Sequence, residues 1–141
     1  MAMTFPALAR RLLAAAGALV WLASPSHGQT ALEMSVGCRL IAYAPQNASG
    51  VVNAPLTFET GRCWGGFLAL QQASLYRDER NRPSMNLCLP PESTLTQLVR
   101  IFVRYTDSHP EEIGENWFRI AHKSMASAFP CAPAAKPGDG G

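Results

Sequence analysis

The chain has 141 residues and a mass of 15.2 kDa, which allows one domain of ordinary size and excludes a large multidomain enzyme. Hydrophobic residues make up 48% of it and charged residues 16%, so the composition excludes a mostly disordered protein. If a leader carrying Arg10 and Arg11 is removed, 12 − 2 = 10 basic residues balance 10 acidic ones, and this neutrality favours neither nucleic acid nor an anionic membrane surface as a partner.

Residues 1–28 have the features of a cleavable signal peptide. Arg10 and Arg11 precede an apolar run over residues 12–23, and small residues at Ser26 and Gly28 follow with the spacing that signal peptidase accepts. Twelve apolar residues are too few to span a bilayer, so an uncleaved anchor is the less favoured alternative. We expect cleavage after Gly28, which leaves an exported chain of 141 − 28 = 113 residues with no membrane attachment.

The cysteines all lie after the predicted leader. An even number of cysteines in a small exported chain predicts disulfides and an oxidising compartment. A zinc site or a redox-active pair is the competing interpretation, and the absence of any Cys-x-x-Cys spacing argues against both. We therefore expect two structural disulfides among the four residues Cys38, Cys63, Cys88 and Cys131.

The first two helices are expected over residues 31–44 and 63–76, with a loop rich in turn-forming residues over 45–61 between them. Each segment carries large side chains at helical spacing, and such a stripe is typical of the buried side of a helix. The stripe of the first helix is Leu32, Val36, Leu40 and Tyr43, and that of the second is Trp64, Phe67, Leu68, Gln71 and Leu75.

The last two helices have capping boxes at their predicted starts. Thr94 and Gln97 open the third, and Ser108 and Glu111 open the fourth, which continues to Phe129 before a proline stops it. We expect Arg100 and Arg104 to face solvent, and residues 132–141 to form a disordered tail. The buried stripes are Leu95, Leu98, Val99, Phe102 and Tyr105 in the third helix, and Ile113, Trp117, Ile120, Ala121, Ser124, Met125 and Ala128 in the fourth.

These elements predict an all-α fold, a small disulfide-linked bundle of about four helices over residues 29–131. If neighbouring helices are antiparallel, the start of the second helix returns towards the first and brings Cys63 to Cys38. Cys88, just before the third helix, and Cys131, just after the fourth, then lie at a common end. The topology therefore predicts the pairs Cys38–Cys63 and Cys88–Cys131.

No motif in the chain indicates catalysis or a cofactor. His109 and His122 are the imidazoles that remain after the leader, and their separation excludes a His-Glu-x-x-His metal site. The acidic residues are accounted for by loops and by the start of the last helix. We expect a protein that is not an enzyme and that holds no cofactor and no metal ion.

A set of motifs, in order, resembles the Tai-like immunity proteins, called resistance-associated proteins in some bacteria. The resemblance covers about residues 33–131 and rests on cysteines, prolines and helix starts with matching spacing. Trp64 and Phe67 depart from the more usual Gly-Tyr pattern, which points to a different partner specificity. The motifs are Cys63-Trp64-Gly65-Gly66-Phe67, Cys88-Leu89-Pro90-Pro91, Thr94-Leu95-Thr96-Gln97-Leu98, Tyr105, His109-Pro110-Glu111 and Phe129-Pro130-Cys131.

The resemblance implies a small helical protein of the periplasm that binds a type VI secretion effector, a peptidoglycan amidase, and blocks its active site. It also implies a homodimer and a protruding loop that enters the amidase cleft. One hypothesis for the contact is the acidic turn between the third and fourth helices, with Thr106, Asp107, Ser108, His109, Glu111 and Glu112, although the pattern favours an ordinary capped turn. A different function left open is that of a small periplasmic disulfide-linked chaperone that binds unfolded clients through exposed apolar surface.

Overall fold

The computed structural model describes residues 28–83 and 85–131, so the predicted leader before Gly28 and the predicted tail lie outside the described residues. This part of the chain forms four α-helices and one short 3₁₀ helix, with isolated β-bridges and no strands. The prediction of an all-α bundle is confirmed. The elements are α2 (Ala31–Ala42), α3 (Phe58–Ser74), α4 (Leu95–Ser108), η1 (Pro110–Glu112) and α5 (Trp117–Ala128).

Three threonines start the first three helices. The hydroxyls of Thr30, Thr57 and Thr94 each accept a hydrogen bond from the backbone N–H three residues later. At Thr30 the return bond is also made, because its own N–H donates to the Glu33 carboxylate at 2.9 Å. Thr94 forms the hydroxyl half of the predicted capping box. These bonds satisfy backbone donors that a helix start leaves without an intrahelical partner.

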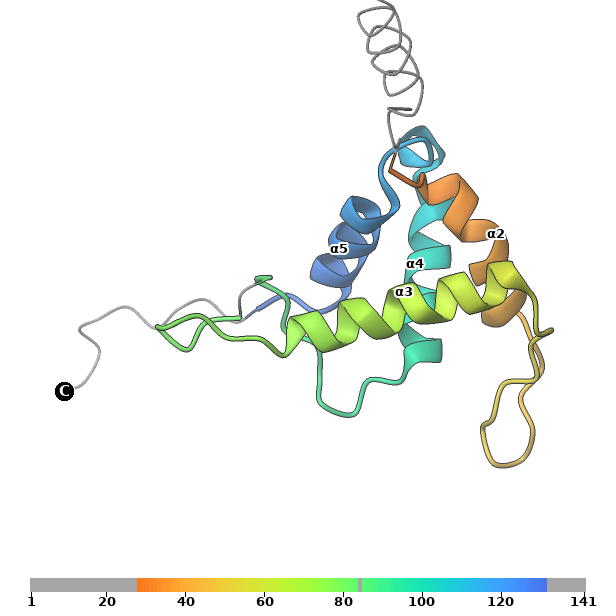
Figure 1. Cartoon of the computed structure of the whole chain (residues 1–141), viewed down its shortest axis with the longest axis horizontal. Coiled ribbons are helices and arrows are strands. Elements are labelled where there is room, and N and C mark those ends of the chain that lie inside the picture. The colour runs from red at the N-terminus through yellow and green to blue at the C-terminus, as the bar shows by residue number, and fades with distance from the viewer. Residues whose placement is uncertain (1–27, 84, 132–141) are drawn as a thin grey trace, which may run out of the picture.

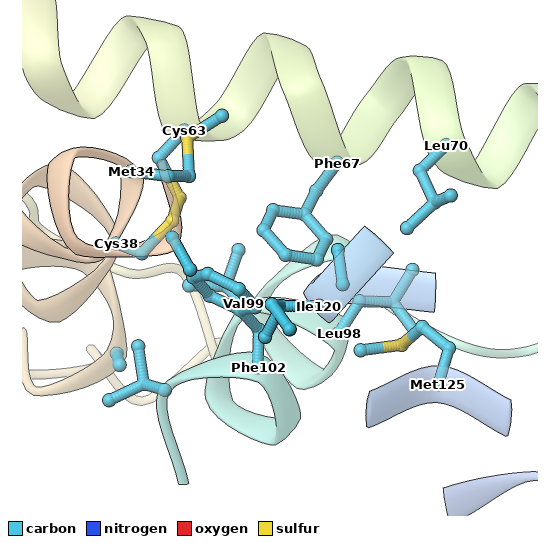
Figure 2. Packing of buried hydrophobic residues seen from close by; sticks show 14 of the residues in the cluster. Met34, Cys38, Cys63, Phe67, Leu70, Leu98, Val99, Phe102, Ile120 and Met125 are labelled. Atoms are coloured by element: carbon cyan, nitrogen blue, oxygen red, sulfur yellow. A yellow bond between two sulfur atoms is a disulfide. The ribbon is translucent and has the colours of Figure 1, made fainter. Parts of the chain in front are cut away.

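The helices meet around an aromatic centre. Figure 1 shows α3 lying across the other helices, and Figure 2 shows Phe67 pointing from α3 towards the side chains of α4. The ring centroids of Phe67 and Phe102 are 5.3 Å apart, and Trp117 of α5 approaches Phe67 to 6.2 Å. The fully buried large side chains include Met34, Phe67, Leu70, Leu87, Leu98, Phe102, Ile120 and Met125.

Both predicted disulfides are confirmed. Cys38 is linked to Cys63 with a Cα–Cα distance of 5.3 Å, which ties α2 to α3. Cys88 is linked to Cys131 with a Cα–Cα distance of 5.1 Å, which ties the loop before α4 to the segment after α5. The second bridge therefore closes the part of the chain that contains α4 and α5.

The predicted buried side of α2 was wrong. The four residues of the predicted stripe are exposed, with relative accessibilities of 51% for Leu32, 53% for Val36, 42% for Leu40 and 68% for Tyr43. The opposite side of α2 is buried instead. It carries many small residues, and these let α2 approach its neighbours closely. The buried residues of α2 are Ala31, Met34, Ser35, Gly37, Cys38, Ile41 and Ala42.

The second predicted helix begins too late and its stripe is only partly correct. α3 starts at Phe58, five residues before the expected start, because Thr57 and Thr60 form a capping box that sequence reasoning missed. Phe67 is buried as predicted, whereas Trp64, Leu68 and Leu75 are exposed. The core side of α3 is made by Thr60, Cys63, Phe67, Leu70 and Ser74.

The predicted start of the last helix at Ser108 was also wrong. Ser108 ends α4, a 3₁₀ turn follows, and α5 starts at Trp117 with Asn116 as its cap. The carbonyls of Glu115 and Ile113 accept hydrogen bonds from the start of α2. The N–H of Ala31 donates to Glu115 and that of Leu32 to Ile113, each at 2.8 Å. Those carbonyls would otherwise accept within one continuous helix. The burial of Ile120, Ala121, Ser124 and Met125 agrees with the prediction.

Candidate functional site

The predicted contact segment spans the last turn of α4 and η1, and one of its residues faces inward. Thr106 is 1% exposed and its hydroxyl donates to the Val103 carbonyl at 2.9 Å. Asp107, Ser108 and Glu111 are exposed, and His109 and Glu112 are half-buried. The structure therefore brings five of the six predicted residues to one stretch of surface and places Thr106 in the core.

Ion pairs and hydrogen bonds fix this segment to α2. Asp107 forms an ion pair with Arg39 at 2.6 Å and accepts a hydrogen bond from the Tyr43 hydroxyl at 3.0 Å. The hydrogen bond to Asp107 raises the pKa of Tyr43, because it favours the protonated hydroxyl. The predicted acidic turn is thus held against α2 by the polar end of that helix.

A second set of contacts fixes the segment to α5. The Glu112 carboxylate accepts from Lys123 at 2.7 Å and from the Tyr105 hydroxyl at 3.3 Å. The hydrogen bond from Lys123 lowers the pKa of Glu112 below its ordinary range, and the same bond raises the pKa of Lys123. The His109 ring stacks on Tyr105 with centroids 4.0 Å apart. These contacts link the segment to α5 and to the last turns of α4.

Both histidines of the described residues have hydrogen-bond partners. His109 Nδ1 lies 2.9 Å from the Tyr105 carbonyl oxygen, and His122 Nε2 lies 2.7 Å from that of Met85. They belong to different elements, the end of α4 and the middle of α5. Over residues 28–83 and 85–131, no three His, Cys, Asp or Glu side chains come together as a metal site would require.

Exposed apolar surface is the feature that sequence reasoning missed. Phe58 is 75% exposed and Leu56 fully exposed, and a groove of about 550 Å³ lies between the loop before α3 and α3 itself. No charged residue lines it. The groove residues include Val51, Val52, Pro55, Leu56, Gly61 and Trp64.

The outer face of α3 extends this uncharged surface. The only charged residues of α3 are Glu59 and Arg62, so this helix carries no charged side chain from Cys63 to its end. This composition is the sequence signal for the exposed apolar surface, since a helix that is apolar on several faces is expected to be buried against other protein. Contiguous exposed apolar surface of this kind is typical of protein interaction sites.

Within the part of the chain that the structure describes, no helix combines the length and the hydropathy needed to cross a bilayer. A family model described as Rap1a immunity proteins matches residues 41–131. No curated protein and no solved structure matches the chain. The matched region includes α3, α4 and α5 and three of the four cysteines. Because the match covers more than half of the chain, this protein belongs to the Rap1a immunity proteins, a type VI secretion immunity family.

Proposed function

We propose that this chain is a periplasmic immunity protein that binds a peptidoglycan amidase effector of a type VI secretion system and blocks its active site without catalysing a reaction itself. The family match over residues 41–131 carries the proposal. The motifs that resemble the Tai-like proteins support the amidase as the class of effector. Two disulfides support an oxidising compartment, since they form and persist there.

The proposed contact is the surface of Asp107, Ser108, His109, Glu111 and Glu112. Its ion pairs with Arg39 and Lys123 restrain two of its carboxylates, which reduces the side-chain entropy that is lost when a partner binds. Glu111 is exposed in η1, and among the described residues it forms no ion pair. Glu111→Ala is the variant that tests this contact without removing an ion pair.

The resemblance also implies a homodimer, and we include it in the proposal. The exposed residues Leu32, Val36, Leu40 and Tyr43 give α2 an apolar stripe on its outer side. Sedimentation equilibrium of the oxidised protein measures its oligomeric state directly. A dimer that becomes a monomer in Val36→Glu supports the proposal, and a monomer at all concentrations contradicts it.

The function is tested by using the oxidised, exported protein as bait in periplasmic and secreted extracts of its host. We expect one dominant partner, an amidase, in a fixed ratio, and we expect its hydrolysis of peptidoglycan to stop when the purified protein is added. Bait that has been reduced and alkylated is the control for folding. An amidase that binds and retains full activity contradicts the blocking mechanism.

The exposed apolar side chains favour one second candidate, a periplasmic chaperone for unfolded clients. Leu56 and Phe58 are the most exposed members of that surface. The chaperone function predicts many unrelated captured proteins and reversible binding of a hydrophobic dye as the pH falls. The immunity function predicts one partner and dye binding that does not change with pH.

A further inference from the structure

A basic pocket lies where the end of α2 meets one side of α4. Its volume is about 310 Å³, and its walls include Tyr43, Gln46, Gln97, Arg100 and Arg104. Gln97, Arg100 and Arg104 follow one another at helical spacing, so α4 presents them on one side. The lining contains no Asp or Glu.

Among the described residues, Arg100 and Arg104 of this pocket have no carboxylate partner, and the same is true of Arg62 on α3, which instead donates to the Glu33 carbonyl at 2.8 Å. Arg39, Arg119 and Lys123 each form an ion pair with a carboxylate, at 2.6, 2.9 and 2.7 Å. The Arg104 guanidinium has no ion pair or hydrogen bond with any residue in the described ranges.

Arg100 is only partly engaged. Its Nε donates to the Ala42 carbonyl at 3.0 Å, which orients the guanidinium and leaves its terminal nitrogens as donors. This half-buried arginine was predicted to face solvent, and its bond to the end of α2 corrects that expectation.

The pocket also adjoins the proposed effector contact. Tyr43 lines the pocket, and its hydroxyl donates to Asp107 of the contact segment. Asp107 is paired with Arg39, and no carboxylate of residues 28–83 or 85–131 pairs with Arg100 or Arg104. A partner that covers residues 107–112 would therefore extend over positive charge at this edge.

We propose that this pocket receives a carboxylate of an Asp or Glu side chain on the bound effector. The proposal rests on the function proposed above. Two guanidinium groups one helical turn apart offer the fork of donors that a carboxylate accepts, with Gln97 and Gln46 as neutral donors beside them. The immunity protein thus recognises its partner by a charge pair next to the acidic segment.

The pocket is tested first without the effector. A blocked Glu-Glu dipeptide is titrated into the oxidised protein, and the arginine Nε–Hε signals are followed by NMR. We expect saturable shifts of Arg100 and Arg104, no such shifts with a blocked Gln-Gln dipeptide, and at least about tenfold weaker binding in Arg104→Gln, since hydrogen bonds to charged groups are worth about a tenfold change in affinity or more.

Arg119→Gln on α5 removes the same charge elsewhere and is expected to bind the dipeptide as the unmodified protein does. Equal binding by Arg104→Gln, or no saturable shift, overturns the proposal. Inorganic phosphate is titrated in parallel: saturation by phosphate without saturation by the dipeptide identifies a small-anion site and also overturns it.

The captured amidase provides the second test. Arg104→Glu should weaken its binding by about tenfold or more and Arg104→Lys by less, because lysine keeps the charge and loses the fork of donors. Unchanged amidase affinity in Arg104→Glu overturns the inference and leaves the immunity function intact. Failure of the unmodified protein to bind any amidase refutes the proposed function instead. The dipeptide titration then shows by itself whether the pocket binds a carboxylate.

Discussion

At the scale of single residues, two glycines in helices have opposite surroundings. A Cβ added at Gly37 would collide with the backbone carbonyl of Glu59, so the absence of a side chain lets α2 and α3 cross closely. A Cβ added at Gly65 would meet nothing within 4 Å. Glycine lowers helix stability relative to alanine, so packing against the described residues does not explain Gly65.

We predict that Gly37→Ala destabilises the protein by about 1 to 3 kcal/mol, because the crossing must open to admit the methyl group. The matched variant Gly65→Ala should stabilise it by about 0.5 to 1 kcal/mol, because alanine favours the helix. Urea unfolding of both variants measures the difference. Equal stability of the two would contradict the close approach of α2 to Glu59.

The pair of Glu112 and Lys123 predicts a dependence of stability on pH. The pKa of Glu112 is lowered from 4.5 chiefly by the hydrogen bond from Lys123, with smaller contributions from Tyr105 and His109. Its contribution is therefore complete above pH 4.5 and is lost as the pH falls through the lowered folded value. For Lys123 the pKa is raised above 10.5, so its contribution is lost as the pH rises beyond that value.

Glu112→Gln should remove part of the loss of Tm below pH 4.5, because the glutamine side chain does not titrate. Thermal unfolding from pH 2 to 7 measures this. Lys123→Met is the control, and it should weaken the same acid transition because Glu112 loses its main partner. A profile in Glu112→Gln that matches the unmodified protein would show that the pair does not contribute.

At the scale of elements, Asn116 decides where the last helix begins. Its side chain accepts hydrogen bonds from the N–H groups of Phe118 and Arg119, at 3.1 and 3.3 Å. Ser108, the predicted cap, instead lies in α4 and donates to the Arg104 carbonyl. The N–H of Trp117 donates to the Gln29 carbonyl, so the first residue of α5 is also held by the segment before α2.

We predict that Asn116→Ala lowers stability by about 1 kcal/mol, the usual cost of losing a side-chain cap. Ser108→Ala should change it by less than about 0.5 kcal/mol, as exposed positions without a special role do. Chemical denaturation of the two variants is the measurement. A larger loss in Ser108→Ala would favour the longer helix predicted from the sequence.

At the scale of the whole molecule, the two disulfides join the elements in different ways. The chain-entropy model gives roughly 3.5 kcal/mol for the bridge across 25 residues and roughly 4 kcal/mol for the one across 43 residues. Cys38 and Cys63 are fully buried, so their removal also costs packing, whereas Cys88 and Cys131 are half-buried.

We therefore predict that replacing Cys38 and Cys63 by serine destabilises the protein more than replacing Cys88 and Cys131, although the second bridge closes the larger loop. Two buried hydroxyls would lack the partners that they need. Guanidinium unfolding under oxidising conditions compares the two double variants, and both should be less stable than the parent. The opposite order would show that loop entropy outweighs packing.

The sequence alone determined the features that depend on local chemistry or on pairing at the ends of elements. Thr94 caps its helix because a hydroxyl at that position meets the Gln97 N–H whatever surrounds it. The disulfides followed from the order of the helices along the chain. The buried stripe of α4, centred on Leu98 and Phe102, was also found because one side of that helix is apolar and the other is polar.

Only the tertiary structure decided which sides of α2 and α3 are buried, where α5 begins and where the basic pocket lies. Both sides of α2 are apolar, and Gly37 and Cys38 mark the core side only because they permit close packing against α3. The start of α5 depends on Ile113 and Glu115 accepting from the backbone of α2, a contact between residues about 80 positions apart. Contacts between distant segments outweighed the local periodicity and capping signals, since the first N–H groups of α2 have no partner within their own helix and find one in the segment before α5.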